Sequence, residues 1–134
     1  MIRYYDPEDI RQADILAVEK YGITSLELME NAGTNAASEV MKRYPDSNCH
    51  SILIFAGPGN NGGDGFVAAR FFLDKGLKVR LILSADPDSY KGDAKTNLDT
   101  LMQLNAPECT VKYSKDLSDI EIKKEVNDAD CLID

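Results

Sequence analysis

Histidine and cysteine are scarce in this sequence, which has one histidine, His50, and three cysteines, Cys49, Cys109 and Cys131. The cysteines are odd in number and form no CxxC pair, so they indicate neither a disulfide framework nor a zinc site. His50 has no Ser, Cys or Asp partner at a spacing typical of nucleophilic catalysis. The sequence therefore disfavours both a catalytic and a metal-binding role for His50, and surface placement is expected.

Long apolar runs are also missing. No window holds the roughly 18 or more apolar residues that a membrane-spanning helix requires. The first residues, MIRYYDPEDIRQ, contain acids where a secretory signal needs an apolar stretch. We therefore expect no membrane association and a cytoplasmic location.

Positive charge is in short supply as well: 15 Lys and Arg stand against 23 Asp and Glu, giving a net charge of -8. The basic residues are scattered without forming a stripe, which makes nucleic acid an unexpected partner. Hydrophobic residues make up 43% of the chain, as in ordinary globular proteins. A length of 134 residues suits one domain over 1–134.

Two helices with capping signals are predicted before the first strand. Asp6 followed by Pro7 and two acids is typical of a helix N-terminus and predicts a helix over 7–21. Thr24 with a glutamate three residues later forms a capping box, and the small apolar residues that follow recur at helical spacing. This pattern predicts a second helix over 25–43.

The rest of the chain alternates between apolar runs and helical periods. Strands are predicted over 51–55, 78–83 and 109–112 and from residue 131, and helices over 64–75, 93–104 and 120–128. Such alternation predicts right-handed crossovers and a mostly parallel α/β sheet with helices on both faces. Because no helix follows the last strand, we expect that the sequence is cut off at Asp134.

A glycine-rich segment, GPGNNGGDG over 57–65, lies between the first predicted strand and the next helix. Loop amides and a helix N-terminus at this place in a sheet can receive an anionic ligand. A turn that only reverses the chain is the simpler alternative. Five glycines in nine residues, with two adjacent asparagines, favour a binding loop over that turn.

Two known nucleotide-binding motifs are relevant to this segment. A Walker A loop needs Lys and Ser or Thr where this chain has Gly63 and Asp64, so a P-loop NTPase is excluded. Gly57, Gly59 and Gly62 satisfy GxGxxG, and Asp86, which lies 24 residues after Gly62, stands where a ribose-binding acid belongs. A Rossmann NAD(P)-binding oxidoreductase is therefore a rival hypothesis, although Asp64 places a negative charge near any pyrophosphate.

MENAG over 29–33, followed by GPGNNGGDGFVAAR over 57–70, resembles the YjeF N-terminal domain family. The resemblance covers the whole chain and implies a Rossmann-like three-layer α/β/α fold, with the C-terminal part of the usual domain absent. It implies an isomerase, an NAD(P)H-hydrate epimerase that interconverts the R and S forms of hydrated NADH and NADPH (NADHX and NADPHX). It further implies a homodimer and a fused or separate NAD(P)HX dehydratase partner.

The same resemblance assigns residues to the site. Asn60, Asn61, Gly62, Gly63 and Asp64 match the family's stretch that contacts the hydrated dinucleotide. Asn61 also matches its potassium ligand, and so does Asp134. Amide and carboxylate oxygens just beyond the carboxyl ends of parallel strands are ligands that suit a hard cation.

The resemblance also bears on catalysis. The family's proton-transferring acid lies beyond residue 134, so Asp64 and Asp134 are the only local candidates for a catalytic role. We therefore expect this chain alone to be a poor epimerase that still binds dinucleotide in part. A non-enzymatic alternative also exists, because the domain resembles a dimerising scaffold in mRNA decapping.

Overall fold

The computed structural model describes residues 4–44 and 49–134. Five α-helices and four strands follow one another in this part of the chain, with short 3-10 turns after β2 and β3. They are α1 (Pro7–Tyr21), α2 (Ser25–Arg43), β1 (Ser51–Ala56), α3 (Asn60–Asp74), β2 (Lys78–Leu83), η1 (Pro87–Ser89), α4 (Gly92–Gln103), β3 (Cys109–Tyr113), η2 (Ser114–Asp116), α5 (Asp119–Asn127) and β4 (Cys131–Ile133).

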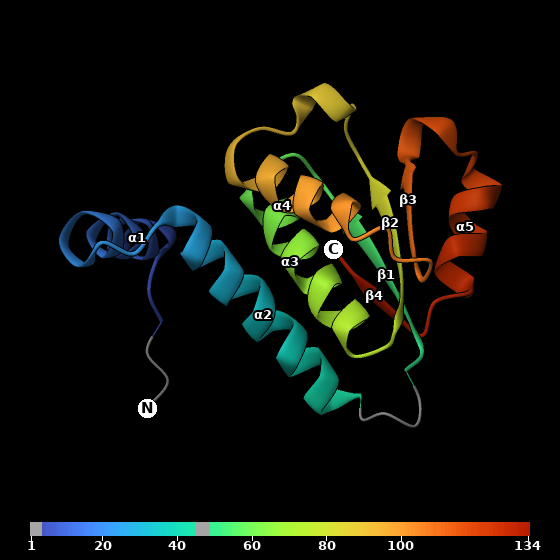
Figure 1. Ribbon diagram of the computed structural model, residues 1–134, viewed down its shortest axis with the longest axis horizontal. Helices are drawn as coiled ribbons and strands as arrows, with labels where there is room; N and C mark the ends of the chain where they lie inside the picture. The colour runs from blue at the N-terminus through green and yellow to red at the C-terminus, as the bar shows by residue number, and fades with distance from the viewer. Residues whose placement is uncertain (1–3, 45–48) are drawn as a thin grey trace.

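The four strands form one parallel sheet in the order β3-β2-β1-β4. Helices α2, α3 and α4 lie over one face of this sheet, and α5 lies on the other side, beside β3 (Figure 1). Ion pairs from Glu125 of α5 to Arg80 and Lys112 fix α5 against β2 and β3. The predicted α/β fold with a parallel sheet and helices on both faces is confirmed.

The predicted starts of α1 and α2 are confirmed atom by atom. The Asp6 carboxylate accepts hydrogen bonds from the amides of Glu8 and Asp9, both 2.9 Å long. Thr24 and Glu27 form the reciprocal capping box at the start of α2. Local side chains therefore set both helix boundaries, as the sequence predicted.

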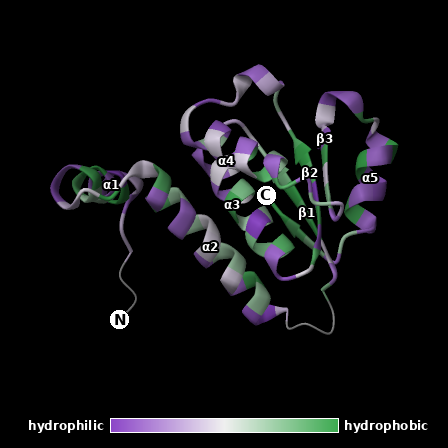
Figure 2. Ribbon diagram, viewed as in Figure 1, coloured by the Kyte–Doolittle hydropathy of each residue, from purple (hydrophilic) through white to green (hydrophobic). Residues whose placement is uncertain are grey.

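The core lies between the sheet and α3. Most of its largest fully buried side chains come from β1, β2 and α3, among them Phe66, Phe72, Ile52, Ile54 and Leu81. Hydropathy divides the helices accordingly, with apolar residues toward the sheet and polar residues outside (Figure 2). Because α1 has no buried residue and contacts only α2 closely, it stands apart from this core (Figure 1).

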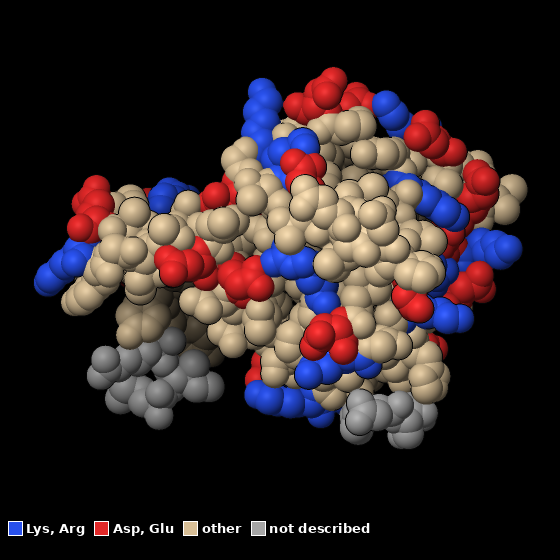
Figure 3. Space-filling model, viewed as in Figure 1, with Lys and Arg blue, Asp and Glu red and all other residues tan. Residues whose placement is uncertain are grey.

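The outer surface carries interspersed charges. On the face drawn in Figure 3, lysines and arginines alternate with acids and form no continuous basic stripe. His50 is exposed, as predicted. No helix in the described ranges is both long enough and apolar enough to cross a membrane.

The Asp130 carboxylate joins the start of β4 to the start of β1. It accepts hydrogen bonds from the amides of His50 at 2.8 Å and Ser51 at 2.9 Å, across 79 residues or more of sequence. These bonds favour the charged form and lower the pKa of Asp130. The two strands are thereby aligned so that their carboxyl ends lie at the same edge.

The start of α3 differs from the sequence prediction. The helix was expected from Asp64 with a loop before it, whereas the structure begins it at Asn60. A Cβ atom on Gly62 would overlap the carbonyl oxygen of Gly57, and one on Gly63 would lie 2.5 Å from the Met29 sulfur. Close packing therefore requires glycines inside this helical turn and overrides their poor helix propensity.

Helices α2 and α3 meet at Gly33. A Cβ atom there would lie 2.5 Å from both the carbonyl oxygen of Asp64 and the Cβ of Val67. Backbone lies directly on backbone at this crossing, and no flexible side chain can move aside. Gly33 thus sets the distance between α2 and the first turns of α3.

Gly33→Ala is expected to lower the free energy of unfolding by about 1 to 3 kcal/mol, because the new methyl group overlaps rigid neighbours. Gly59→Ala is the control: its Cβ meets nothing within 4 Å and its φ of -85° suits alanine. The control should change the free energy of unfolding by less than about 0.5 kcal/mol, because the entropy gained by replacing glycine opposes the loss of a glycine N-cap. Urea unfolding measures both, and equal effects at the two sites would contradict the tight crossing.

Candidate functional site

The carboxyl ends of the strands form the candidate ligand-binding edge. From β1 the chain adds β2 and then β3 on one side of the sheet. The last strand, β4, then pairs with the other side of β1. Open α/β sheets bind ligands in the crevice at such a switch point. Gly57 follows β1 and Asp134 follows β4, so these two residues border that crevice.

The N-terminus of α3 opens beside the same edge. Its N-cap is Gly59, which offers no side-chain hydrogen bond, whereas α1, α2 and α5 are capped by Asp6, Thr24 and Ser118. The first amides of a helix have no partner inside the helix and carry its partial positive charge. The start of α3 can therefore receive an anionic group such as a phosphate.

Two cavities lie on either side of the first turns of α3. The larger, of about 510 Å³, lies between α1, α2 and the starts of α3 and α4, and Asn60 lines it. The smaller, of about 180 Å³, lies between α2, β1 and β4, and Asn61 lines it. Asp64 borders both, so the adjacent asparagines face different spaces with Asp64 between them.

The smaller cavity contains both residues that the family resemblance assigns to potassium. Asn61 and Asp134 both line it, together with Asp64. Gly62 and Gly63 line neither cavity, because they are buried against Gly57 and Met29. Within residues 4–44 and 49–134, no group of three or more His, Cys, Asp or Glu side chains is placed to hold a metal ion.

Asp64 is the acid whose environment is most relevant to proton transfer. It is half-buried, and this burial raises the pKa of its carboxyl above the ordinary aspartate value. A carboxyl group with a raised pKa is a better proton donor near neutral pH than an exposed one. Asp64 and Asp134, the two candidate acids, thus border one small cavity.

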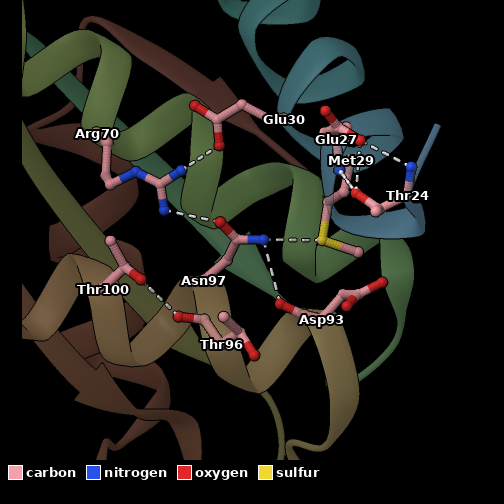
Figure 4. Close-up of polar contacts among 9 residues, drawn as sticks. All are labelled: Thr24, Glu27, Met29, Glu30, Arg70, Asp93, Thr96, Asn97 and Thr100. Carbon is pink, nitrogen blue, oxygen red and sulfur yellow. Dashed lines mark hydrogen bonds and ion pairs between the residues drawn. The ribbon is translucent and has the colours of Figure 1, made fainter. Parts of the chain in front are cut away.

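A polar network that sequence reasoning missed holds α2, α3 and α4 together behind the site (Figure 4). Arg70 donates to the Asn97 side chain at 2.7 Å and forms an ion pair with Glu30. Asn97, which is 3% exposed, donates to the Met29 sulfur at 3.1 Å. Since Met29 contacts Gly63, the network supports the first turn of α3 from behind.

Asp86, which the oxidoreductase hypothesis assigned to a ribose, forms an ion pair with Lys115 at the ends of β2 and β3. Ser84, Ser89 and Ser114 surround this pair in a hollow of about 300 Å³. The structure therefore places Asp86 at the ligand edge of the sheet, beyond a strand neighbouring β1.

The fold and these loops define an open parallel α/β protein with a ligand crevice at the switch point between β1 and β4. Residues 25–134 match the family described as YjeF-related protein N-terminus. The chain belongs to this family.

Named relatives extend this result. A Pirellula staleyi protein called NAD(P)H-hydrate epimerase is 45% identical over 95 residues, which are 71% of this chain and 40% of that protein. A Moorella thermoacetica protein called bifunctional NAD(P)H-hydrate repair enzyme Nnr is 41% identical over 97 residues, covering 72% of this chain and 18% of its own length. This chain spans less than half the length of either relative.

A solved structure shares the fold. The crystal structure of the yeast protein YNL200c superposes with a TM-score of 0.72 at 22% identity, over 86% of this chain and 49% of the yeast chain. At this level of identity the likeness concerns the arrangement of helices and strands. It agrees with the Rossmann-like architecture expected from the sequence resemblance.

Asp64→Asn is expected to stabilise the protein at neutral pH. A folded-state pKa raised by burial adds stability below the unfolded value of about 3.9, and this stability is lost as pH rises through the folded value. Because asparagine stays neutral, the advantage of the variant over the wild type should shrink as the pH falls toward about 4.

Urea midpoints measured from about pH 8 to about pH 4 test this. Asp88→Asn, in the exposed turn η1, is the control for losing one negative charge from an acidic protein. An advantage of Asp64→Asn that is constant with pH, or equal to that of the control, contradicts the prediction.

Proposed function

We propose that the protein is part of a metabolite-repair enzyme, an NAD(P)H-hydrate epimerase acting on NADHX and NADPHX. The observation that carries the proposal is the shared cavity of Asn61, Asp64 and Asp134 beside the uncapped start of α3. The names of the relatives favour this activity over the oxidoreductase and scaffold alternatives. Residues 1–134 are proposed to form one domain of that enzyme.

The proposed binding mode follows from these positions. The amides at the start of α3 hold the pyrophosphate, and the Asn61 side chain reaches the nicotinamide half. Asn60 binds from the larger cavity, and Gly62 and Gly63, which have no side chain, contribute backbone amides only. Asp64 and Asp134 are the candidate acids for moving a proton near the C6 carbon whose configuration is inverted.

Potassium is proposed as the cation of the smaller cavity. The amide oxygen of Asn61 and the carboxylate of Asp134 are the hard oxygen donors that such an ion accepts, and both border the same space. A cation there supplies positive charge beside the ligand's phosphates. The residues present therefore fit the ion.

The oxidoreductase alternative is separated from the epimerase by ligand preference. We expect the protein to bind NADHX or NADPHX more tightly than NADH, NADPH, NAD or NADP, because Asn61, Asp64 and Asp134 in the smaller cavity offer hydrogen bonds to the added hydroxyl of a hydrated ring. Calorimetry with each ligand measures this. Tighter binding of the unmodified cofactors would favour the oxidoreductase, and no dinucleotide binding at all would favour the scaffold.

Asn61→Ala is expected to weaken NADHX binding roughly tenfold or more, because one hydrogen bond to a charged group is worth about 1.5 to 3 kcal/mol. Asn60→Ala should cost less, since Asn60 borders the other cavity. Calorimetric titration of both variants in potassium and in a potassium-free buffer makes the comparison.

The loss at Asn61 should shrink without potassium, because the mutation and the missing ion remove the same interaction. Asn60→Ala is the matched control, as it removes the same amide from the neighbouring helical position. Equal losses at the two positions, insensitive to the ion, contradict the assignment of Asn61.

Assembly and location complete the proposal. A homodimer is supported by the exposed apolar side chains of α1, among them Ile10, Leu16 and Tyr21. A dehydratase partner, fused or separate, is proposed as the second activity, and relatives named bifunctional NAD(P)H-hydrate repair enzymes support it. The proposed place of action is the cytoplasm.

A further inference from the structure

The hollow beyond β2 and β3 is built from two short turns at one end of the sheet. Turn η1 follows β2 and turn η2 follows β3, and Figure 1 shows both segments at the same sheet end. The hollow measures about 300 Å³ and is lined mostly by polar residues: Leu83, Ser84, Ala85, Asp86, Ser89, Ser114 and Lys115. Neither the sequence resemblance nor the proposed nicotinamide site uses it.

Hydroxyl groups and one ion pair dominate this lining. Within the described ranges, the side chains of Ser84, Ser89 and Ser114 make no hydrogen bond to another residue, whereas Asp86 is paired with Lys115. The Asp86 carboxylate retains further acceptor capacity beside this pair. Such a lining suits a polyhydroxyl group like a ribose, which can donate to the carboxylate and exchange hydrogen bonds with the serines.

This hollow adjoins the crevice at the switch point, because the two share Ser84 in their lining. Ser84 also lines the adjacent cavity of about 410 Å³, which Gly57 and Asp134 border. From β4 to β3 the edge spans three strand spacings, roughly 14 Å at about 4.8 Å each. A dinucleotide needs two such neighbouring subsites, with its pyrophosphate at the helix start between them.

We propose that this hollow binds the adenosine-side ribose of the hydrated dinucleotide and selects a free 2′-hydroxyl over a 2′-phosphate. The proposal rests on the proposed function, because it places the second half of the same ligand. It identifies NADHX as the preferred substrate over NADPHX.

Charge decides the direction of this preference. The two turns and the η1 N-cap carry three carboxylates, Asp86, Asp88 and Asp116, against one ammonium group, Lys115. Lys115 is already neutralised by Asp86, so a 2′-phosphate gains little from it and is repelled by the acids. A 2′-hydroxyl can donate to Asp86 without breaking the pair.

The test uses two stable probes that lack a nicotinamide, 5′-AMP and adenosine 2′,5′-bisphosphate, with binding measured by calorimetry. The wild type should bind 5′-AMP more tightly. Asp86→Asn releases Lys115 and removes one repelling charge, so the affinity ratio should move toward the bisphosphate by roughly tenfold. Adding Lys115→Ala to that variant should reverse most of the gain.

Asp88→Asn is the matched control, because it removes the same charge from the same turn at a residue outside the hollow. An equal shift of the ratio in Asp88→Asn and Asp86→Asn overturns the proposal. Failure of both nucleotides to bind at millimolar concentration overturns it as well.

The outcome is separable from that of the proposed function, since neither probe contains the hydrated ring. A ratio controlled by Asp86 together with no preference for NADHX over NADH would leave the ribose subsite standing and refute the epimerase. Preferred binding of NADHX with a ratio insensitive to Asp86 would do the reverse.

Discussion

Helix α2 can lie against helix α3 only because Gly33 presents no side chain where it meets the backbone of Asp64 and the Cβ of Val67. The same approach brings Met29 against Gly63, so one helix crossing supports the whole first turn of α3. The part of the site that α3 contributes depends on where that turn begins. The close contact at Gly33 positions the amides of this turn, together with Asn61 and the half-buried Asp64.

The glycine-rich segment therefore has two functions that the sequence alone does not separate. Gly57 and Gly59 connect β1 to α3 and leave the first amides of α3 without a side-chain cap. Gly62 and Gly63, in contrast, allow the helix to pack closely. Glycine normally weakens a helix by about 1 kcal/mol per residue relative to alanine. The polar contacts of Asn97 and Arg70 add fixed support behind this weak turn.

Local signals made the first two helix starts and the first strand predictable. Asp6, Thr24 and the apolar run of β1 determine their own conformations, and the parallel α/β sheet follows from the alternation of strands and helices. The start of α3 was misplaced because tertiary packing overrides the propensity of glycine. The network at Asn97 could not be found either, since it joins residues of three helices whose proximity depends on the folded crossing.

Pairing of β4 with β1 has a consequence for the order in which the site is assembled. The two strands meet across about 79 residues of sequence, through Asp130 and the register of Ile52 with Cys131. During synthesis Asn61 emerges from the ribosome long before Asp134, and the two can share a cavity only once β4 has docked. A ligand that contacts both residues holds β4 against β1, and its binding free energy adds to the stability of that pairing.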